Sequence, residues 1–114
     1  MSDKRLSKHA ALKFRASVFA ALGDETRLAV LAKLVGGEPQ SITRLTAGSK
    51  LTRQAVTKHL RVLEKAGVVR SVRAGREALF ELEPEAIGDA RNYLDQVSRQ
   101  WDDALVRLKA HVEG

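Results

Sequence analysis

The last third of the chain is predicted to form one helix that is too long for a domain of this size. Pro84 suits the first turn of a helix, where its missing N–H is not needed, and no further proline follows it. A helix over 84–112 would be about 43 Å long at ~1.5 Å per residue. A compact chain of 114 residues has a radius of gyration of only ~13 Å. The helix must therefore project from the domain, bend, or pack on a second subunit.

The apolar residues of this segment recur at alternating intervals of three and four. They are Ile87, Ala90, Leu94, Val97, Trp101, Ala104 and Leu108, with Leu105 and Val112 widening the stripe. A stripe this wide on so long a helix favours an interface between two copies of the chain. The expected dimer interface comprises Phe14, Val18, Ile87, Leu94, Val97, Trp101, Leu105 and Leu108. The alternatives are a fold-back onto the first helix and, for Trp101, a small-molecule pocket.

Positive charge is concentrated in the middle third of the chain. Lys and Arg number 20 against 14 Asp and Glu, which gives a net charge of +6. Residues 44–76 carry nine basic side chains against Glu64 alone, whereas residues 77–114 carry four basic and nine acidic side chains. Such a basic segment is expected where a protein meets a polyanion, and the alternative is an ordinary solvated surface. Glu64 is expected to pair along its helix with Arg61 or Lys65.

Glycine and proline divide the N-terminal two thirds into short helices. We predict helices over 10–22, 25–35, 42–47 and 52–66, with residues 1–8 frayed. The expected N-caps are Asp24, Ser41 and Thr52. The expected buried stripes are Leu28, Leu31, Ala32 and Val35 on the second helix and Val56, Leu60 and Leu63 on the fourth.

The segments 42–47 and 52–66 have the spacing of a helix-turn-helix. Two strand-like segments follow at 68–73 and 77–82, joined by a short turn, and a hairpin this small must pack on the helices. The expected fold is therefore mostly α with a small β-hairpin, in a single domain over 1–114. Its parts are the helix-turn-helix at 42–66, the hairpin at 68–83 and the dimerisation helix at 84–113.

The outer face of the helix over 52–66 carries side chains suited to the major groove of DNA. The expected base-reading residues are Arg53, Gln54, Thr57, Lys58 and Arg61. Arg pairs with guanine and Gln with adenine, and the first turns of a recognition helix are the part that reaches base edges. The expected backbone contacts are Arg44, Lys50 and Lys65, with Arg73 and Arg76 on the hairpin. Thr52 and His59 are further candidates, although His59 could instead cap the edge of the core.

Two motifs carry a family resemblance. They are Gly23-Asp24-Glu25-Thr26-Arg27-Leu28 and Lys58-His59-Leu60-Arg61-Val62-Leu63-Glu64-Lys65-Ala66-Gly67. With the hairpin at 73–82, the chain resembles the ArsR/SmtB family of winged helix-turn-helix repressors over about residues 12–113. The resemblance implies a homodimer that binds double-stranded DNA at an imperfect inverted repeat and represses a promoter, with the first and last helices at the dimer interface. A cytoplasmic location is expected separately, because a chain without cysteine fits a reducing compartment. The alternatives are a winged helix with an architectural or RNA-binding role, and a repressor controlled by a protein partner.

No metal and no cofactor is expected. The chain has no cysteine, which removes the thiolate sites of the family's arsenic and cadmium sensors. The last helix offers Asp95, Asp102, Asp103 and Glu113 but only one histidine, His111, and the spacings Asp-x-His and His-x-x-Glu are absent. The sequence contains no set of catalytic residues and no phosphate-binding loop, so nothing in it indicates an enzyme. The sequence contains no run of about 18 apolar residues, so no membrane-spanning helix is expected.

Overall fold

The computed structural model describes the backbone of residues 4–114 and the side chains from residue 8 onward. The elements are α1 (Lys4–Leu22), α2 (Glu25–Ala32), β1 (Gln40–Ser41), α3 (Ile42–Thr46), α4 (Arg53–Lys65), β2 (Val69–Ala74), β3 (Glu77–Leu82) and α5 (Pro84–Glu113). The predicted fold, mostly α with a small β-hairpin, is confirmed. Of the residues expected to fray, 4–8 belong to the backbone of α1, and 1–3 lie outside the described part.

Side-chain caps start three of the helices at the predicted residues. The side chain of Asp24 accepts a hydrogen bond from the Arg27 N–H at 2.9 Å. Ser41 and Thr52 do the same for α3 and α4, each at 3.1 Å. These caps satisfy N–H groups that have no partner within the helix, so they fix where each helix begins.

The predicted stripe of α2 is wrong except for Leu31, which is buried. The helix ends at Ala32 instead of near Val35, and its buried side chains are Val30 and Leu31, joined by Leu34 in the turn that follows. Leu28 and Val35 are 52% and 72% exposed. The shorter helix is held in place by Lys33, whose Nζ donates to the Leu45 carbonyl at 2.8 Å.

The hairpin belongs to a three-stranded antiparallel sheet with the order β1-β3-β2. In the predicted pair, Arg70 lies opposite Glu81, and Gly75 provides a positive φ of 65° at the turn. Strand β1 was not predicted, because two residues beside Pro39 show no alternation. Its Gln40 pairs with Phe80 of β3, which ties the hairpin to the start of α3.

Helix α4 lies at the centre of the core. Its predicted inner stripe, Val56, Leu60 and Leu63, is fully buried. The surrounding core side chains come from all the other elements apart from β1, and they include Val18, Leu34, Leu45, Val68 and Phe80. Val18 was expected at the dimer interface, but it is only 1% exposed in the single chain and packs in this core instead. The inner face of α4 is therefore fixed by packing, and its opposite face is free to meet a ligand.

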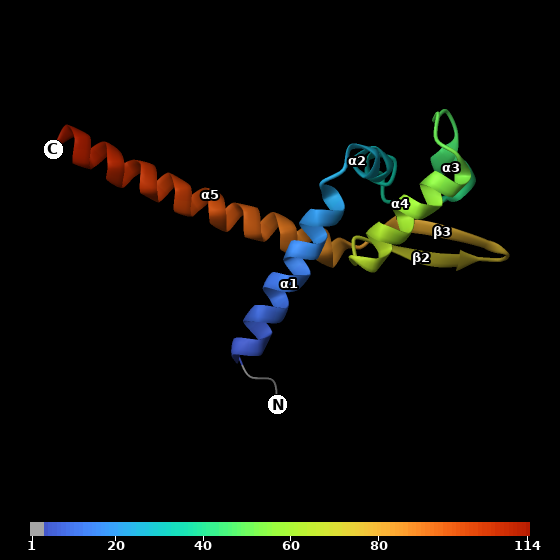
Figure 1. Cartoon of the computed structure of the whole chain (residues 1–114), viewed down its shortest axis with the longest axis horizontal. Coiled ribbons are helices and arrows are strands. Elements are labelled where there is room, and N and C mark those ends of the chain that lie inside the picture. Colours follow the sequence, from blue (N-terminus) through green and yellow to red (C-terminus); the bar gives the residue numbers. More distant parts are fainter. Residues whose placement is uncertain (1–3) are drawn as a thin grey trace.

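Helix α5 projects from this core (Figure 1). The molecule measures 65 × 42 × 21 Å and has a radius of gyration of 18.6 Å, well above the ~13 Å of a compact chain. Helix α1 covers only the first turns of α5. There, Arg15 donates two hydrogen bonds of 3.1 Å to Asp89, and Phe19 lies 5.9 Å from Tyr93 between ring centroids. Beyond Tyr93 the apolar stripe is uncovered.

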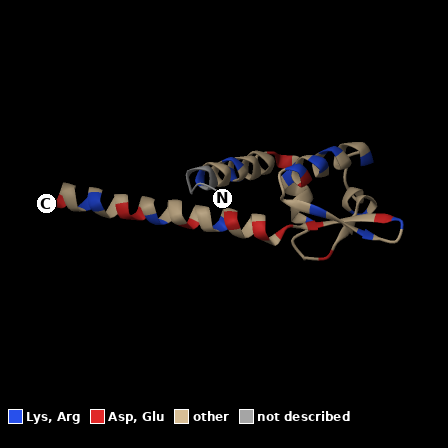
Figure 2. Ribbon diagram, turned by 90° about the horizontal axis from the view of Figure 1, so that it is seen from below, with Lys and Arg blue, Asp and Glu red and all other residues tan. Residues whose placement is uncertain are grey.

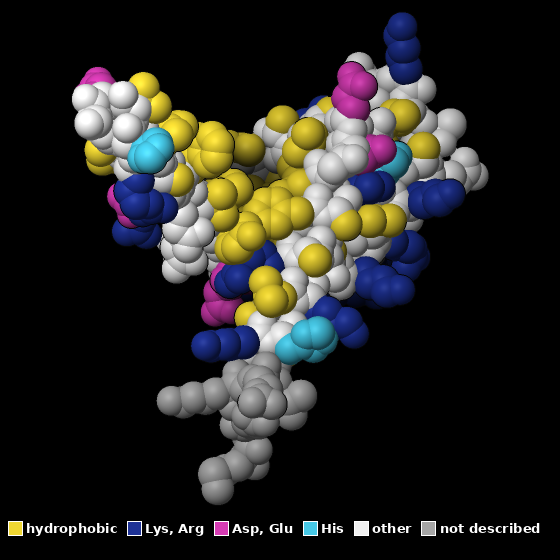
Figure 3. All heavy atoms as spheres, turned by 60° about the vertical axis from the view of Figure 1, so that its left-hand side comes forward, with side chains coloured by type: hydrophobic (Ala, Val, Ile, Leu, Met, Phe, Trp, Pro, Cys, Tyr) yellow, Lys and Arg dark blue, Asp and Glu magenta, His cyan; other side chains and the backbone are white. Residues whose placement is uncertain are grey.

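The uncovered stripe of α5 is a large apolar surface. Trp101 and Leu108 are 64% and 58% exposed, and Leu94, Val97 and Leu105 are exposed as well. Figure 3 shows hydrophobic side chains gathered in the angle between α1 and the projecting helix. The alternative to a dimer interface, a fold-back onto α1, is thus limited to the base of α5. Between residues 4 and 114, no helix is long and apolar enough to traverse a lipid bilayer.

Candidate nucleic-acid interface

The structure brings all five predicted base-reading residues together on the outer face of α4. Arg53, Gln54, Thr57, Lys58 and Arg61 line one open groove of about 670 Å³. They meet there because the helix turns every 3.6 residues, so the residues left over from the buried stripe share the opposite face. Figure 2 shows Lys and Arg along this part of the chain and again at the tip of the hairpin, at the end remote from the C-terminus.

Two members of this groove are held by local hydrogen bonds. Arg53 donates from Nη1 to the hydroxyl of Thr43 on α3 at 2.5 Å. Thr57 donates its hydroxyl to the carbonyl of Arg53 at 2.7 Å. Among the described residues, the side chains of Gln54, Lys58 and Arg61 make no such bond, so no hydrogen bond has to break when they turn toward a ligand.

The predicted backbone-contacting residues are spread around this groove. Arg44 on α3 and Lys50 in the loop before α4 are exposed on the N-terminal side of α4. Arg73 and Arg76 flank the hairpin turn, where Arg73 donates to the Arg76 carbonyl at 3.5 Å. Lys65 is different, because it lines a separate hollow with Ser17 and Arg27 on the side of α1.

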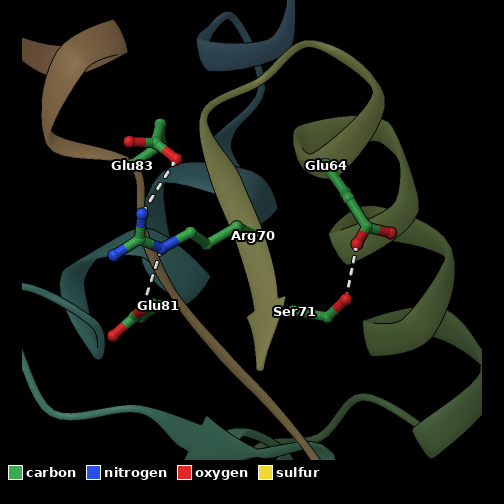
Figure 4. A network of polar contacts seen from close by, with 5 residues as sticks. All are labelled: Glu64, Arg70, Ser71, Glu81 and Glu83. Carbon is green, nitrogen blue, oxygen red and sulfur yellow. Dashed lines mark hydrogen bonds and ion pairs between the residues drawn. The ribbon is translucent and has the colours of Figure 1, made fainter. Parts of the chain in front are cut away.

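Arg70 counts toward the basic segment but is paired with two carboxylates. Its guanidinium lies 2.8 Å from Glu81 and 3.4 Å from Glu83 (Figure 4). The hydrogen bond to Glu81 raises the pKa of Arg70. Glu64, expected to pair with Arg61 or Lys65, instead accepts a hydrogen bond of 2.9 Å from the Ser71 hydroxyl on β2. The contact of Glu64 between α4 and β2 thus replaces the pairing along the helix that spacing alone suggests.

His59 lies on a different side of α4 from the groove. Its side chain is 23% exposed, and Nδ1 lies 3.9 Å from a carboxylate oxygen of Asp24. That nitrogen is buried without a hydrogen-bond partner among the described residues. The Arg27 N–H lowers the pKa of Asp24, with a smaller contribution from His59. This position fits the alternative role for His59, that of a residue at the edge of the core. Thr52, the other further candidate, is the N-cap of α4.

The described residues offer no assembled metal site. Within residues 4–114, no three His, Asp or Glu side chains converge in a way that could hold a metal ion. The carboxylates of α5 are instead distributed along and around that helix. Asp89 pairs with Arg15, and Glu113 lies 4.0 Å from Lys109 one turn earlier.

A capped helix with a polar, basic outer face, preceded by α3 and followed by a basic hairpin, defines the winged helix-turn-helix class of DNA-binding proteins. A family model described as a helix-turn-helix domain matches residues 22–72. The chain is 35% identical over 85 residues to the HTH-type transcriptional regulator Rv2034 of Mycobacterium tuberculosis, across 75% of this chain and 76% of that protein.

Solved structures of transcriptional regulators resemble this fold as well. An ArsR-like transcriptional regulator from Rhodococcus sp. RHA1 superposes with a TM-score of 0.76 at 36% identity, over 88% of this chain and 93% of that one. A possible ArsR-family regulator from Mycobacterium bovis, described as a homodimeric winged helix-turn-helix DNA-binding domain, has a TM-score of 0.63 at 23% identity, over 92% and 91% of the chains. The chain belongs to the ArsR family of winged helix-turn-helix transcriptional regulators. The resemblance stated from the sequence is thereby confirmed.

Proposed function

We propose that the protein is a homodimeric repressor that binds an inverted-repeat operator through α4 and the hairpin of each subunit. The observation that carries the proposal is the groove of Arg53, Gln54, Thr57, Lys58 and Arg61, set on a helix whose other face is fully buried. A rigid helix that presents bidentate donors at its first turns is suited to reading base edges in the major groove.

The uncovered stripe of α5 supports the homodimer. Side chains such as Trp101 and Leu108 are apolar and exposed, and they continue the face that packs on α1 at the base of the helix. Contiguous apolar surface of this kind marks an interaction site. The structural neighbour from Mycobacterium bovis is described as homodimeric. A two-fold axis at α5 would place two copies of α4 on one DNA duplex, and two-fold proteins bind inverted repeats.

Residue roles follow from position and available donors. In the proposal, the five groove residues contact bases, Arg44 and Lys50 contact phosphates beside them, and Arg73 and Arg76 contact the backbone or minor groove beyond. Lys65, which faces the hollow beside α1, is given a phosphate contact only at the margin of the interface. A bound dimer excludes other proteins from its site, which is how binding would repress a promoter.

The test is selection of bound sequences from random duplex DNA, followed by footprinting on the best sequence. We expect two inverted half-sites about one helical turn (~34 Å), or a multiple of it, apart. Uniform affinity for unrelated duplexes would contradict sequence-specific regulation and support an architectural role. Placing the selected site over a promoter in a reporter then tests the sign, because repression predicts lower transcription and activation predicts higher transcription.

A further inference from the structure

A cavity of about 700 Å³ lies where α1, the end of α4, β2 and the start of α5 meet. Its apolar wall is formed by Ala11, Phe14, Val69 and Ala86. Gly67 lies next to this wall, where its φ of 80° favours glycine and a Cβ at this position would lie within van der Waals distance of the ring of Phe14. A mostly apolar cavity of this size with a few polar groups is the usual form of a small-molecule site.

The polar groups of this cavity are mostly acidic. Glu64, Glu83, Glu85 and Asp89 line it against the single cation Arg70, although the chain as a whole has a net charge of +6. Two of these carboxylates already form ion pairs, Glu83 with Arg70 and Asp89 with Arg15. Glu64 accepts one hydrogen bond, from Ser71, and Glu85 has no partner among the described side chains. The cavity therefore disfavours anions and DNA and has carboxylate oxygens left to accept from a cation.

The cavity is also lined by two residues, Glu64 and Ser71, that join α4 to the hairpin through a hydrogen bond. Figure 4 shows that Arg70 and Ser71 leave β2 on opposite sides, one toward Glu81 and Glu83 and the other toward Glu64 of α4. Glu83 directly precedes α5, so the same residues connect the hairpin to the helix proposed to dimerise. A ligand cation that binds Glu64 would compete with the Ser71 hydroxyl for that carboxylate.

We propose that this cavity binds a small amphipathic organic cation, with its apolar body against Phe14 and its ammonium group at Glu64 and Glu85, and that this binding weakens the attachment to DNA. An aromatic ring and carboxylates together favour such ligands. The DNA half of the proposal rests on the proposed function. Linkage requires the coupling to be mutual, so DNA must weaken binding of the cation by the same factor.

Binding is tested with three probes that share one skeleton: 3-phenylpropylammonium, 3-phenylpropanol and 3-phenylpropionate. The full-length protein is titrated with each while amide resonances are followed by NMR. We expect the ammonium probe to shift the resonances of Gly67, Val69 and Ser71, and the carboxylate probe to leave them unchanged. No shift with the ammonium probe would overturn the site. Equal shifts with all three probes would overturn the assignment to cations.

A matched pair of variants locates the charge that matters. Glu85 and Glu25 are both exposed glutamates in the first turn of a helix, and only Glu85 lines the cavity. Glu85→Gln should weaken binding of the ammonium probe by about tenfold, the effect of losing one charge-assisted hydrogen bond, whereas Glu25→Gln should not change it. Equal effects of the two substitutions would overturn the proposed position of the ammonium group.

Coupling to DNA is measured by fluorescence anisotropy of a labelled duplex. The dissociation constant without probe tests the proposed function by itself, and failure there leaves the NMR result standing. With saturating ammonium probe we expect that constant to rise, and Glu64→Gln to reduce the rise because the competition with Ser71 is removed. An unchanged constant, with the probe shown to be bound by NMR, would overturn the coupling.

Discussion

The proposed recognition helix, α4, and the proposed dimerisation helix, α5, differ in how far their apolar side chains are buried. On α4, the inner residues Val56, Leu60 and Leu63 are fully buried by other parts of the same chain. On α5, comparable residues such as Leu94 and Leu108 are exposed beyond the contact with α1. Both helices are amphipathic, so the difference lies in what covers them. One is completed within the chain, and the other requires the second copy that we propose.

The largest expected effect contrasts the same truncation on the two helices. Leu60→Ala should lower the free energy of unfolding by about 2–5 kcal/mol, because it leaves a cavity in a packed core. Leu108→Ala should instead raise the dissociation constant of the dimer, because its side chain is buried only between copies. Urea denaturation and sedimentation measure the two quantities. Similar unfolding losses for both variants, without any change in dissociation, would remove the distinction between the helices.

The next effect concerns what the free face of α4 reads. Gln54→Ala should cost about 1–3 kcal/mol on the preferred site and relax the sequence preference, because a bidentate contact to a base is lost. Gln100→Ala, which removes the same side chain from the exposed surface of α5, is the control and should leave DNA binding unchanged. Binding is compared on the preferred duplex and on an unrelated one. An equal loss on both would show that Gln54 does not read a base.

A smaller effect separates free from paired arginines on the hairpin. Arg76→Ala should reduce the salt dependence of DNA binding by about one counterion. Arg70→Ala should change that slope much less, because Arg70 is already bound to Glu81 and Glu83. Anisotropy titrations over a series of salt concentrations give both slopes. Equal reductions by the two variants would place Arg70 in contact with DNA as well.

The smallest effect lies at the junction of α1 and α5. The hydrogen bonds from Arg15 lower the pKa of Asp89. A carboxyl group whose pKa is depressed on folding stabilises the protein above its unfolded pKa, about 3.9, and this stabilisation is lost as the pH falls through the lower, folded pKa. Asp89→Asn should therefore flatten the acid side of the stability profile. Thermal denaturation as a function of pH measures this, and an unchanged profile would contradict the role of the pair.

Local signals explain what could be predicted from the sequence. The caps Asp24, Ser41 and Thr52 act within three residues of themselves, and the inner stripe of α4 follows from helical periodicity alone. The five groove residues were predicted for the same reason, as the complement of that stripe. The length of α5 against the size of the chain left three outcomes open: projection from the domain, a bend, or packing on a second subunit. The structure shows that the helix projects.

Long-range packing explains what was missed. Leu34 is buried because a turn after α2 brings it inward, which the periodicity of a helix cannot show. The pairing of Gln40 with Phe80 and of Glu64 with Ser71 depends on how the sheet lies against the helices. The bond from Arg53 to Thr43 depends on the angle between α3 and α4. The cavity beside Phe14 needs four elements in place before it exists.

The proposed second copy is the central claim, and sedimentation equilibrium of the full chain at micromolar concentration tests it most directly. We predict a species of twice the 12.5 kDa mass of the chain. Trp101→Ala should shift it toward monomer, while Val106→Ala, one residue beyond the stripe and about 100° away around the helix, should not. A wild-type protein that sediments as a 12.5 kDa monomer would contradict the account.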